Sequence, residues 1–578
     1  MPGFLAALWL LGLFAAAPAL RTSERYELPD RVRDALVLGV AIPFVLGFVH
    51  ALYPFTCWFV LAVTAGVAAV RRGFGASSLA RMPSAPMPYL LAGALVAVAW
   101  PQLMRPLLDG DSLSYHLPNA ASWVQAHSLW TTVTRYWWYP PGSELFASGV
   151  YAVSGPFALP WCGFLALALL GLRVAAWARS INGTSPLFAD ALAAATITAY
   201  PLAIQGGTLQ NDVWLAAFWL ESLWALRTRT KGAAAMRSLA VTALIKPDGW
   251  IFATIAMLVR RAPRPVWLAA AAAFGLWILR DALLYKSALL SPAGALSQNI
   301  FESTIVAHGA AAFALFARVA IAASPFALLA LLAAFFGPLI APRDRRLGWA
   351  ACAAALLFFV MPFGYETAVA QLATGASLRF ATPAIAAGAI ILTYPARRAS
   401  VIATALLTLS ALFGAWYVLA IFWNDGGTHV AIVFALLALA LAALVRARSI
   451  WPYAVALCLA IAGTTHLASR HALDYYNDSL RVGNVSPGVY RWVATQHPPA
   501  IGGWGLRLGV VNVLAPQTRT LDLADAQPCT QARRERALLV AVAQSDLDAE
   551  TNRTRLERAR NCGPALFEDP IGIVTEPP

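Results

Sequence analysis

The chain has 578 residues, of which 60% are hydrophobic and only 12% are charged, and its mean hydropathy is +0.64. A composition this apolar, with many runs near bilayer length, excludes an ordinary soluble protein and predicts a polytopic helical membrane protein. The net charge of +14 does not indicate nucleic-acid binding, because residues 470–578 hold 12 Arg and 12 acids and are neutral. The surplus lies in residues 1–469 as short Arg clusters between apolar runs, which is typical of cytoplasmic loops.

Taking these Arg clusters as cytoplasmic predicts about 14 full spans. They fall near residues 2–20, 35–51, 55–70, 88–104, 157–173, 187–204, 212–226, 265–280, 322–341, 347–363, 380–395, 399–421, 430–446 and 450–468. The clusters between them lie at residues 21–33, 71–81, 173–179, 227–237, 260–264, 343–346, 397–398 and 446–448.

The stretch at residues 238–259 has Arg on both flanks and "ALIKPDGW" in its middle. A single crossing there would invert every later loop. Two short helices that meet at residues 246–249 keep the sidedness, and Pro and Gly are suitable breakers. We therefore predict a short broken pair, with loops 105–156, 205–211, 281–321, 364–379 and 422–429 and both termini outside.

Four regions follow from this path. We expect an extra N-terminal transmembrane module at 1–87, a membrane core at 88–395, further transmembrane helices at 396–469, and an exterior domain at 470–578. The first apolar run could instead be a signal peptide, but it has no basic n-region, so we expect a retained span.

The exterior tail reads as a small α/β domain. "LRLGVVNVLA", "RALLVAVA" and "GPALFEDPIGIV" are typical of strands, and "SDLDAETNRTRLERAR", with Ser545 as its N-cap, is typical of a helix. Cys529 and Cys562 are the only cysteines in the tail. In an oxidising exterior we expect them to form a disulfide, with two free thiols as the alternative.

Residues 105–156 form the longest exterior loop in the first half of the chain. They begin with "DGDSLSYHLPNAASW" and end in the aromatic turn "YWWYPPG". We expect an amphipathic segment that lies on the outer membrane surface, with Asp109 and Asp111 at its start and close to lipid.

This loop resembles the GT-C glycosyltransferases, closest to the bacterial relatives of protein O-mannosyltransferases and of the lipid A aminoarabinose transferase. The shared pattern is an Asp just after a span, Tyr115 four residues beyond Asp111, an amphipathic stretch and a Pro-Pro turn. Further resemblances follow in order over residues 88–395, in "QNDVWLAAFWL", "ALIKPDG", "RDALLYKSALLSP" and "SLRFATPAIA". One departure is Trp138–Tyr139, which stands where those transferases have Glu-Lys and puts a metal there in doubt.

The resemblance implies an enzyme of the bacterial inner membrane. It would transfer a sugar, with inversion, from a polyprenyl-phosphate donor to an acceptor hydroxyl on the periplasmic face. The acceptor would be a glycolipid, a polysaccharide or a protein. Two other classes stay open, a multi-pass transporter or lipid-linked glycan flippase, and a glycan polymerase or ligase. A flippase or transporter would show repeats and intramembrane charges, and we find one broken helix and no repeat.

Each candidate site residue has an ordinary alternative. We predict Asp111 as the general base, although it could cap a helix, and Asp109 as a turn residue that orients it. Asp212 is as suited to helix capping as to catalysis. The candidate substrate-binding residues are Tyr115, His116, Lys246, Arg280, Lys286 and Arg379. His116 could equally be a surface residue, Lys246 a headgroup contact, and Arg379 an interfacial anchor.

No cofactor is firmly implied by the sequence. A divalent metal stays open, but no metal site is predicted. Glu302 with His308, and Asp425 with His429, are sparse pairs without a ligand spacing that indicates one.

Overall fold

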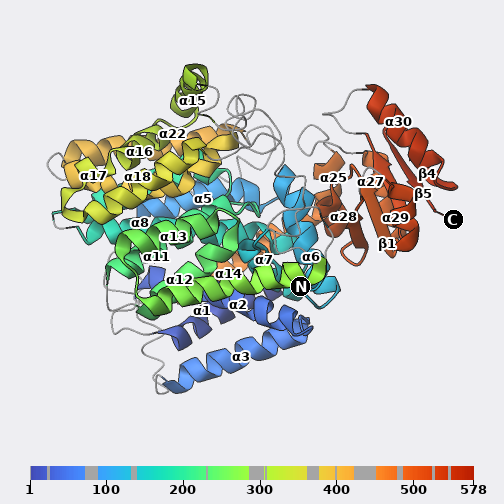
Figure 1. Cartoon of the computed structure of the whole chain (residues 1–578), viewed down its shortest axis with the longest axis horizontal. Helices are drawn as coiled ribbons and strands as arrows, with labels where there is room; N and C mark the ends of the chain where they lie inside the picture. Colours follow the sequence, from blue (N-terminus) through green and yellow to red (C-terminus); the bar gives the residue numbers. More distant parts are fainter. Residues whose placement is uncertain are drawn as a thin grey trace.

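In the computed structural model the chain is a helical bundle joined to a small α/β tail (Figure 1). The structure describes residues 2–21, 27–71, 89–131, 134, 139–181, 183–228, 232–285, 305, 309–360, 376–396, 400–421, 451–477, 486–523, 527–543 and 549–577. Within these, five helices are long and apolar enough to cross a membrane, and seven shorter apolar helices accompany them. The polytopic helical class is confirmed, whereas the predicted number of spans is not tested.

The N-terminal helices pack directly on the rest of the bundle. They are α1 (Pro2–Ala16), α2 (Leu28–Phe48) and α3 (Pro54–Arg71). Helix α1 lies along α24 (Trp451–Arg470), and α2 lies along α7 (Gly142–Ser154). Gly39 of α2 faces the ring of Phe146 so closely that a methyl group would clash with it. The predicted N-terminal module is therefore physically continuous with the core.

The central bundle is built around α11 (Asp212–Arg227), whose residues from Asp212 to Ala225 are all buried. Its neighbours include helices from both halves of the chain. The other bundle helices are α5 (Tyr89–Leu103), α8 (Pro160–Arg179), α9 (Pro186–Thr198), α14 (Arg264–Tyr285), α16 (Pro325–Phe335), α17 (Gly337–Ile340), α18 (Arg345–Val360), α20 (Thr382–Ile391), α21 (Thr393–Ala396) and α22 (Ser400–Ile421).

The predicted broken pair is confirmed. Helix α12 (Gly232–Ile245) ends and α13 (Gly249–Arg260) begins at either side of Lys246–Pro247–Asp248, and the two helices pack against each other. Gly249 sits so close to the carbonyl oxygen of Thr242 that no side chain fits there. Pro247 favours a break in the helix at this point, and the lack of a side chain at Gly249 lets the two helices pack closely beside it.

One correction concerns residues 105–156, predicted as a single exterior loop: they include helices packed inside the protein, whereas their position relative to the membrane surface stays a prediction. A π-helical turn, η2 (Ser112–His116), leads into α6 (Leu117–Gln125), whose residues from Leu117 to Trp123 are all buried. Nearly all of α7 is buried too, because this apolar helix packs against α1 and α2. The cover over α6 comes partly from the tail helix α28 (Leu508–Leu514), which local sequence patterns cannot reveal.

A second correction concerns residues 281–321, predicted as an exterior loop. Within the described part of that stretch, the end of α14 and the apolar helix α15 (Gly309–Ala323) are present. The alanine-rich run of α15 is a strong helix former and is long enough to fold as its own element. In Figure 1 α15 projects from the top of the bundle.

Two of the Arg residues that the sequence places in cytoplasmic loops are buried in the bundle. Arg173 on α8 pairs with Glu221 of α11 at 2.6 Å and with Asp30 of α2 at 2.8 Å. Arg33 on α2 pairs with Asp30 and Asp34, each at 3.0 Å. These pairs join α2, α8 and α11 through charge, because a buried ion without a counterion is strongly unfavourable.

The tail is a five-stranded sheet with helices on both faces, as the predicted α/β pattern required. The strand order is β2-β1-β3-β5-β4, parallel between β2, β1 and β3 and antiparallel beyond β3. The strands are β1 (Ala500–Trp504), β2 (Arg519–Asp522), β3 (Leu538–Val542), β4 (Ala565–Asp569) and β5 (Gly572–Thr575). The helices are α25 (Ala472–Asn477), α27 (Pro487–Gln496), α28, α29 (Pro528–Arg534) and α30 (Ala549–Arg560).

Three of the four predicted tail elements agree with the structure and one does not. β3 and α30 lie where they were expected, and "GPALFEDPIGIV" forms the hairpin β4–β5. "LGVVNVL" was expected as a strand but forms α28, because its apolar residues pack both on the sheet and on η2. Ser545, the predicted N-cap, lies outside the described residues.

The predicted disulfide is confirmed. Cys529 in α29 is bonded to Cys562, which follows α30, with 5.5 Å between their Cα atoms and a sequence separation of 33 residues. The bond therefore ties together two helices on the same face of the sheet.

We expect the Cys529–Cys562 bond to stabilise the tail by about 3–4 kcal/mol, because closing a loop of this length lowers the conformational entropy of the unfolded chain. The double variant Cys529→Ser/Cys562→Ser should lower the thermal midpoint of the tail, measured in detergent with and without reductant. Non-reducing peptide mapping that finds both thiols free in the wild type would contradict the assignment. Cys352→Ser, a substitution at a free cysteine, is the matched control.

Candidate active site

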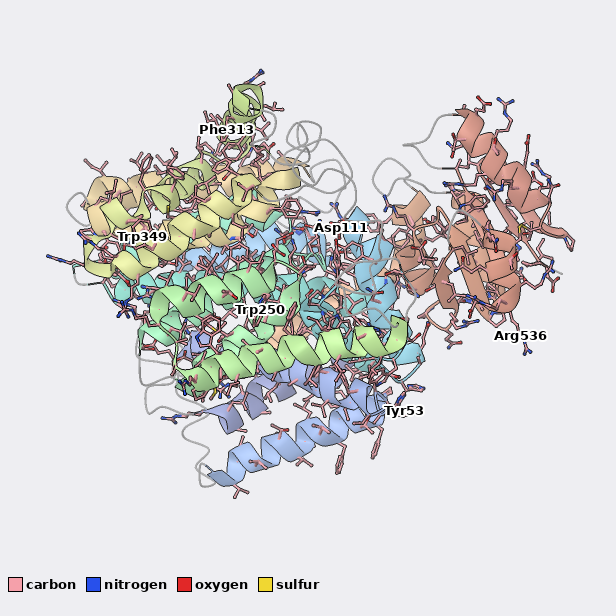
Figure 2. All side chains as sticks on the ribbon, in the orientation of Figure 1. Tyr53, Asp111, Trp250, Phe313, Trp349 and Arg536 are labelled. Atoms are coloured by element: carbon pink, nitrogen blue, oxygen red, sulfur yellow. A yellow bond between two sulfur atoms is a disulfide. The ribbon has the colours of Figure 1, made fainter. Side chains whose placement is uncertain are left out.

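Asp111 lies at the start of η2, at the junction between the helical bundle and the tail (Figure 2). Its side chain makes no helix-capping hydrogen bond. Instead, Asp111 Oδ2 lies 2.6 Å from Nη2 of Arg379, and the Asp111 side chain keeps 33% of its surface exposed. The capping alternative is thus not observed, and the carboxylate stays accessible from one side.

Asp109 has the structural role that the sequence predicts for it. Its Oδ1 accepts the backbone N–H of Ser112 at 2.9 Å, which caps the turn that carries Asp111. Its Oδ2 is buried and has no hydrogen-bond partner among the described residues. Burial raises the pKa of the Asp109 carboxyl above its usual value, and the hydrogen bond from Ser112 opposes that rise.

Asp212 and Lys246 complete a chain of four charged side chains. Lys246 Nζ donates to Asp212 Oδ1 at 2.6 Å, and Nε of Arg379 lies 3.6 Å from Asp212 Oδ2. Asp248 is further away, with its Oδ1 3.9 Å from Lys246 Nζ. Acids and bases therefore alternate in the order Asp111, Arg379, Asp212, Lys246.

These four residues come from four separate segments. Asp111 precedes η2, Asp212 is the first residue of α11, Lys246 lies in the break between α12 and α13, and Arg379 lies in η7 (Ala376–Ala381). Hydrogen bonds between the segments hold them in place. Ser112 Oγ accepts the N–H of Leu209, and Thr382 donates its hydroxyl to the carbonyl oxygen of Asp212 at 3.1 Å.

An aromatic ring supports both cations of the cluster. Lys246 Nζ lies 4.7 Å from the centroid of the Phe380 ring, and Cζ of Arg379 lies 5.0 Å from it. Such contacts favour a partly desolvated cation by about 0.5–2 kcal/mol each. Lys246 therefore contacts a carboxylate and an aromatic ring in this cluster.

The charge of Arg379 controls the basicity of Asp111. Burial acts to raise the pKa of Asp111, but the charges of Arg379, His116 and Lys246 and the hydrogen bond from Arg379 together outweigh it, so this pKa lies below its usual value. Asp111 is thus an ionised carboxylate at neutral pH. Its strength as a base depends on how much of the Arg379 charge it shares.

His116 is buried instead of lying on the surface. Its Nδ1 lies 2.6 Å from Oε1 of Glu144, and Ser143 donates its hydroxyl to Oε2 of the same carboxylate. The ring of Tyr115 lies against His116, with 4.1 Å between centroids, and meets the ring of Tyr139 edge-on. Glu144 is not among the residues predicted from the sequence. The available signal was an acid within the otherwise apolar helix α7.

Of the two remaining predicted cations, Arg280 is described and is not part of this arrangement. Arg280 is fully buried in α14 and donates to the carbonyl oxygens of Leu129 and Thr131 and to Asp281, so it anchors the loop backbone. Lys286 lies outside the described residues, as do Trp138, Glu302, His308, Asp425 and His429. Among the residues that are described, no group of three or more His, Cys, Asp or Glu is placed to hold a metal.

The tail contacts the loop that carries Asp111. Arg507 donates to Ser114 Oγ, the Tyr476 hydroxyl donates to the carbonyl oxygen of Leu107 at 3.0 Å, and Gln125 Nε2 donates to that of Pro516 at 2.8 Å. These bonds connect residues more than 360 positions apart, so the tail helps to position the start of η2.

Comparison with known proteins identified structural neighbours only. No family model matches the chain, and no curated protein matches it. Two crystal structures of ArnT from Cupriavidus metallidurans are similar to it, one bound to undecaprenyl phosphate and one in the apo state. Their TM-scores are 0.45 and 0.48 at 14% and 11% sequence identity, and each match covers 84% of this chain and 97% of the other. ArnT is a lipid A aminoarabinose transferase of the GT-C type, the group that the sequence motifs resemble.

The raised pKa of Asp109 predicts how stability depends on pH. A carboxyl whose pKa is higher in the folded state binds its proton more tightly there, so stability falls as pH rises from about 4, the unfolded value, through the folded value. Asp109→Asn should remove this decline, seen as a flatter dependence of thermal midpoint on pH between 4 and 8. Asp474→Asn, at an exposed tail site, should leave the slope unchanged. Equal slopes for Asp109→Asn and wild type would refute the buried-carboxyl assignment.

Proposed function

We propose that this protein is a membrane glycosyltransferase that moves a sugar from a polyprenyl-phosphate donor to an acceptor hydroxyl on the outer face of the membrane. The observation that carries the proposal is the accessible Asp111 carboxylate, paired with Arg379 at 2.6 Å and joined through Arg379 to Asp212 and Lys246. A base next to partly buried cations suits transfer from a lipid phosphate. The GT-C-like order of the motifs supports the same reaction.

In this mechanism the acceptor hydroxyl gives its proton to Asp111 while its oxygen attacks the anomeric carbon of the sugar. The bond between that carbon and the phosphate oxygen breaks, and the phosphate leaves with the electron pair. Attack from the face opposite the phosphate inverts the anomeric centre. The leaving phosphate gains negative charge, which Arg379 and Lys246 would stabilise.

The pairing of Asp111 with Arg379 would couple proton transfer to Asp111 with breakage of the bond between sugar and phosphate. Before transfer, Arg379 lowers the pKa of Asp111 and makes it a weak base. As the leaving phosphate gains charge, it competes with Asp111 for the same guanidinium, and Arg379 Nε has no hydrogen-bond partner among the described residues. A base released from its counterion becomes stronger, so proton acceptance and bond cleavage would advance together.

Asp111→Asn keeps the shape and removes the proton acceptor. General-base assistance is worth about 10²–10⁴-fold, so sugar transfer should fall by roughly that factor while the protein still folds. The assay is transfer from a polyprenyl-phosphate sugar by purified protein in nanodiscs. Asp109→Asn is the matched control and should cost much less, whereas Arg379→Ala should weaken donor binding as well as turnover.

Near wild-type transfer by Asp111→Asn combined with loss of activity in Asp109→Asn would assign the base to the other carboxylate. If neither substitution matters, the loop is not the active site. A folded wild type that transfers no sugar from such donors, but moves lipid-linked glycans between leaflets, would favour the flippase alternative.

The proposal also requires that the tail and the cytoplasmic loops lie on opposite sides of the membrane. A reporter fused after Ala500 should lie outside the cytoplasm, and one fused within residues 343–346 should lie inside it, because these points lie on opposite sides of the predicted bundle. A pair of phosphatase and fluorescent-protein fusions measures this directly. Opposite results would overturn the topology and the assignment of Asp111 to the outer face.

A further inference from the structure

A charged pocket lies at the far end of two helices whose other ends carry the candidate active site. Helix α11 begins at Asp212 and ends at Arg227, about 24 Å along its axis. Helix α13 begins beside Lys246 and Asp248 and ends at Arg260. The pocket has a volume of about 380 Å³ and is lined by Ser180, Ile181, Arg227, Arg260, Arg343, Asp344 and Tyr394.

The pocket has more positive than negative charge. Three guanidinium groups line it, from Arg227, Arg260 and Arg343, and Asp344 is the one acid among the described lining residues. Asp344 is shared, because Arg260 binds both of its oxygens at 2.9 and 3.2 Å and Arg227 Nε lies 3.4 Å from it. The C-termini of α11 and α13 offset part of the excess, but each supplies only about half a negative charge.

The guanidinium groups retain donors for a further ligand. Arg260 is 8% exposed, and its buried Nε has no hydrogen-bond partner among the described residues. Arg343 is exposed at the rim of the pocket in η6 (Pro342–Asp344). The hydroxyl groups of Ser180 and Tyr394 lie in the lining, and Ser180 already accepts from Arg227 at 3.0 Å. Several convergent N–H donors with an excess of positive charge suit an oxyanion with several acceptor oxygens.

The position of the pocket indicates which class of anion it would meet. α17, just before Arg343, lies on the side of the bundle away from the tail (Figure 1). In the predicted topology this is the cytoplasmic face, where anionic phospholipids concentrate and where basic pockets between helices hold their headgroups. The exposed Leu339 and Trp349 on the neighbouring helices α17 and α18 would face the acyl region next to it.

We propose that this pocket, formed by Arg227, Arg260 and Arg343, is a binding site for a phosphate-bearing anion, namely the headgroup of an anionic phospholipid in the inner leaflet. The site is separate from the candidate active site and does not depend on the proposed glycosyl transfer. It is joined to that site through α11 and α13, so a ligand there would stabilise the helix ends opposite Asp212 and Lys246.

The test measures binding of dioleoylphosphatidylglycerol to the purified full-length chain by native mass spectrometry, with dioleoylphosphatidylcholine and inorganic phosphate as comparison probes. Arg343→Gln removes one charge at the rim, where no packing is disturbed. Because one charge-assisted contact is lost, affinity for the anionic lipid should fall roughly ten-fold or more. Arg346→Gln, an exposed position three residues away that does not line the pocket, is the matched control and should bind as the wild type does.

Three results decide the proposal. Retention of phosphatidylglycerol over phosphatidylcholine, lost in Arg343→Gln but kept in Arg346→Gln, supports a lipid headgroup site. Inorganic phosphate that binds with the same dependence on Arg343 and displaces the lipid supports the phosphate chemistry and assigns a soluble source. Equal loss in both variants, or no preference for the anionic lipid in the wild type, overturns it. Thermal unfolding of both variants checks that the fold is intact.

Discussion

The pairing of buried charges is the constraint on which the rest of this molecule depends. In an apolar bundle an ionised side chain has no water to solvate it, so it persists only beside a counterion with good hydrogen bonds. Helix α11 shows the consequence most clearly. It is buried along almost its whole length, yet it contains Asp212 at its start and Glu221 further along. Each of these acids fixes the position of helices that are remote in the sequence.

The two groups of ion pairs around α11 differ in how accessible they are. Around Glu221 the charges of Arg173, Arg33 and their acids are fully enclosed, and they bind the N-terminal helices to the core. Around Asp212 the chain of charges opens towards Asp111, which keeps a third of its surface accessible. Enclosure gives the first group a structural role. Accessibility at one end would allow the second group to exchange a partner, as the proposed transfer requires.

The sequence predicts those features whose cause is local. The break at Lys246–Pro247–Asp248 follows from Pro and from Arg on both flanks, and the tail disulfide follows from cysteine count and compartment. The spacing between Asp111 and Tyr115 also singles out the loop in which Asp111 pairs with Arg379. The partners of the site residues are not local. Arg379 lies 268 residues beyond Asp111, and Glu144 lies 28 residues beyond His116, so their contacts depend on the tertiary fold.

The errors of prediction have the same physical origin. An Arg cluster looks alike in sequence whether it faces water or, as with Arg33 and Arg173, meets buried acids. The segment around α6 has the composition of an interfacial helix, but residues of the tail cover it. α28 reads as a strand because a short apolar run does not distinguish helix from strand, and only packing against both η2 and the sheet decides between them.

The π-helical turn at η2 has a consequence for how this loop can change in evolution. Its closing bond runs from the N–H of Leu117 to the carbonyl oxygen of Ser112, five residues back, so the turn holds one residue more than an α-helical turn would. One residue in an α-helix corresponds to about 100° of rotation. A chain shortened by one residue here would keep α6 in place but turn Asp111 to a different side of the helix axis, away from Arg379. Alignments of diverging relatives should therefore tolerate substitutions between Ser112 and His116 more readily than a gap.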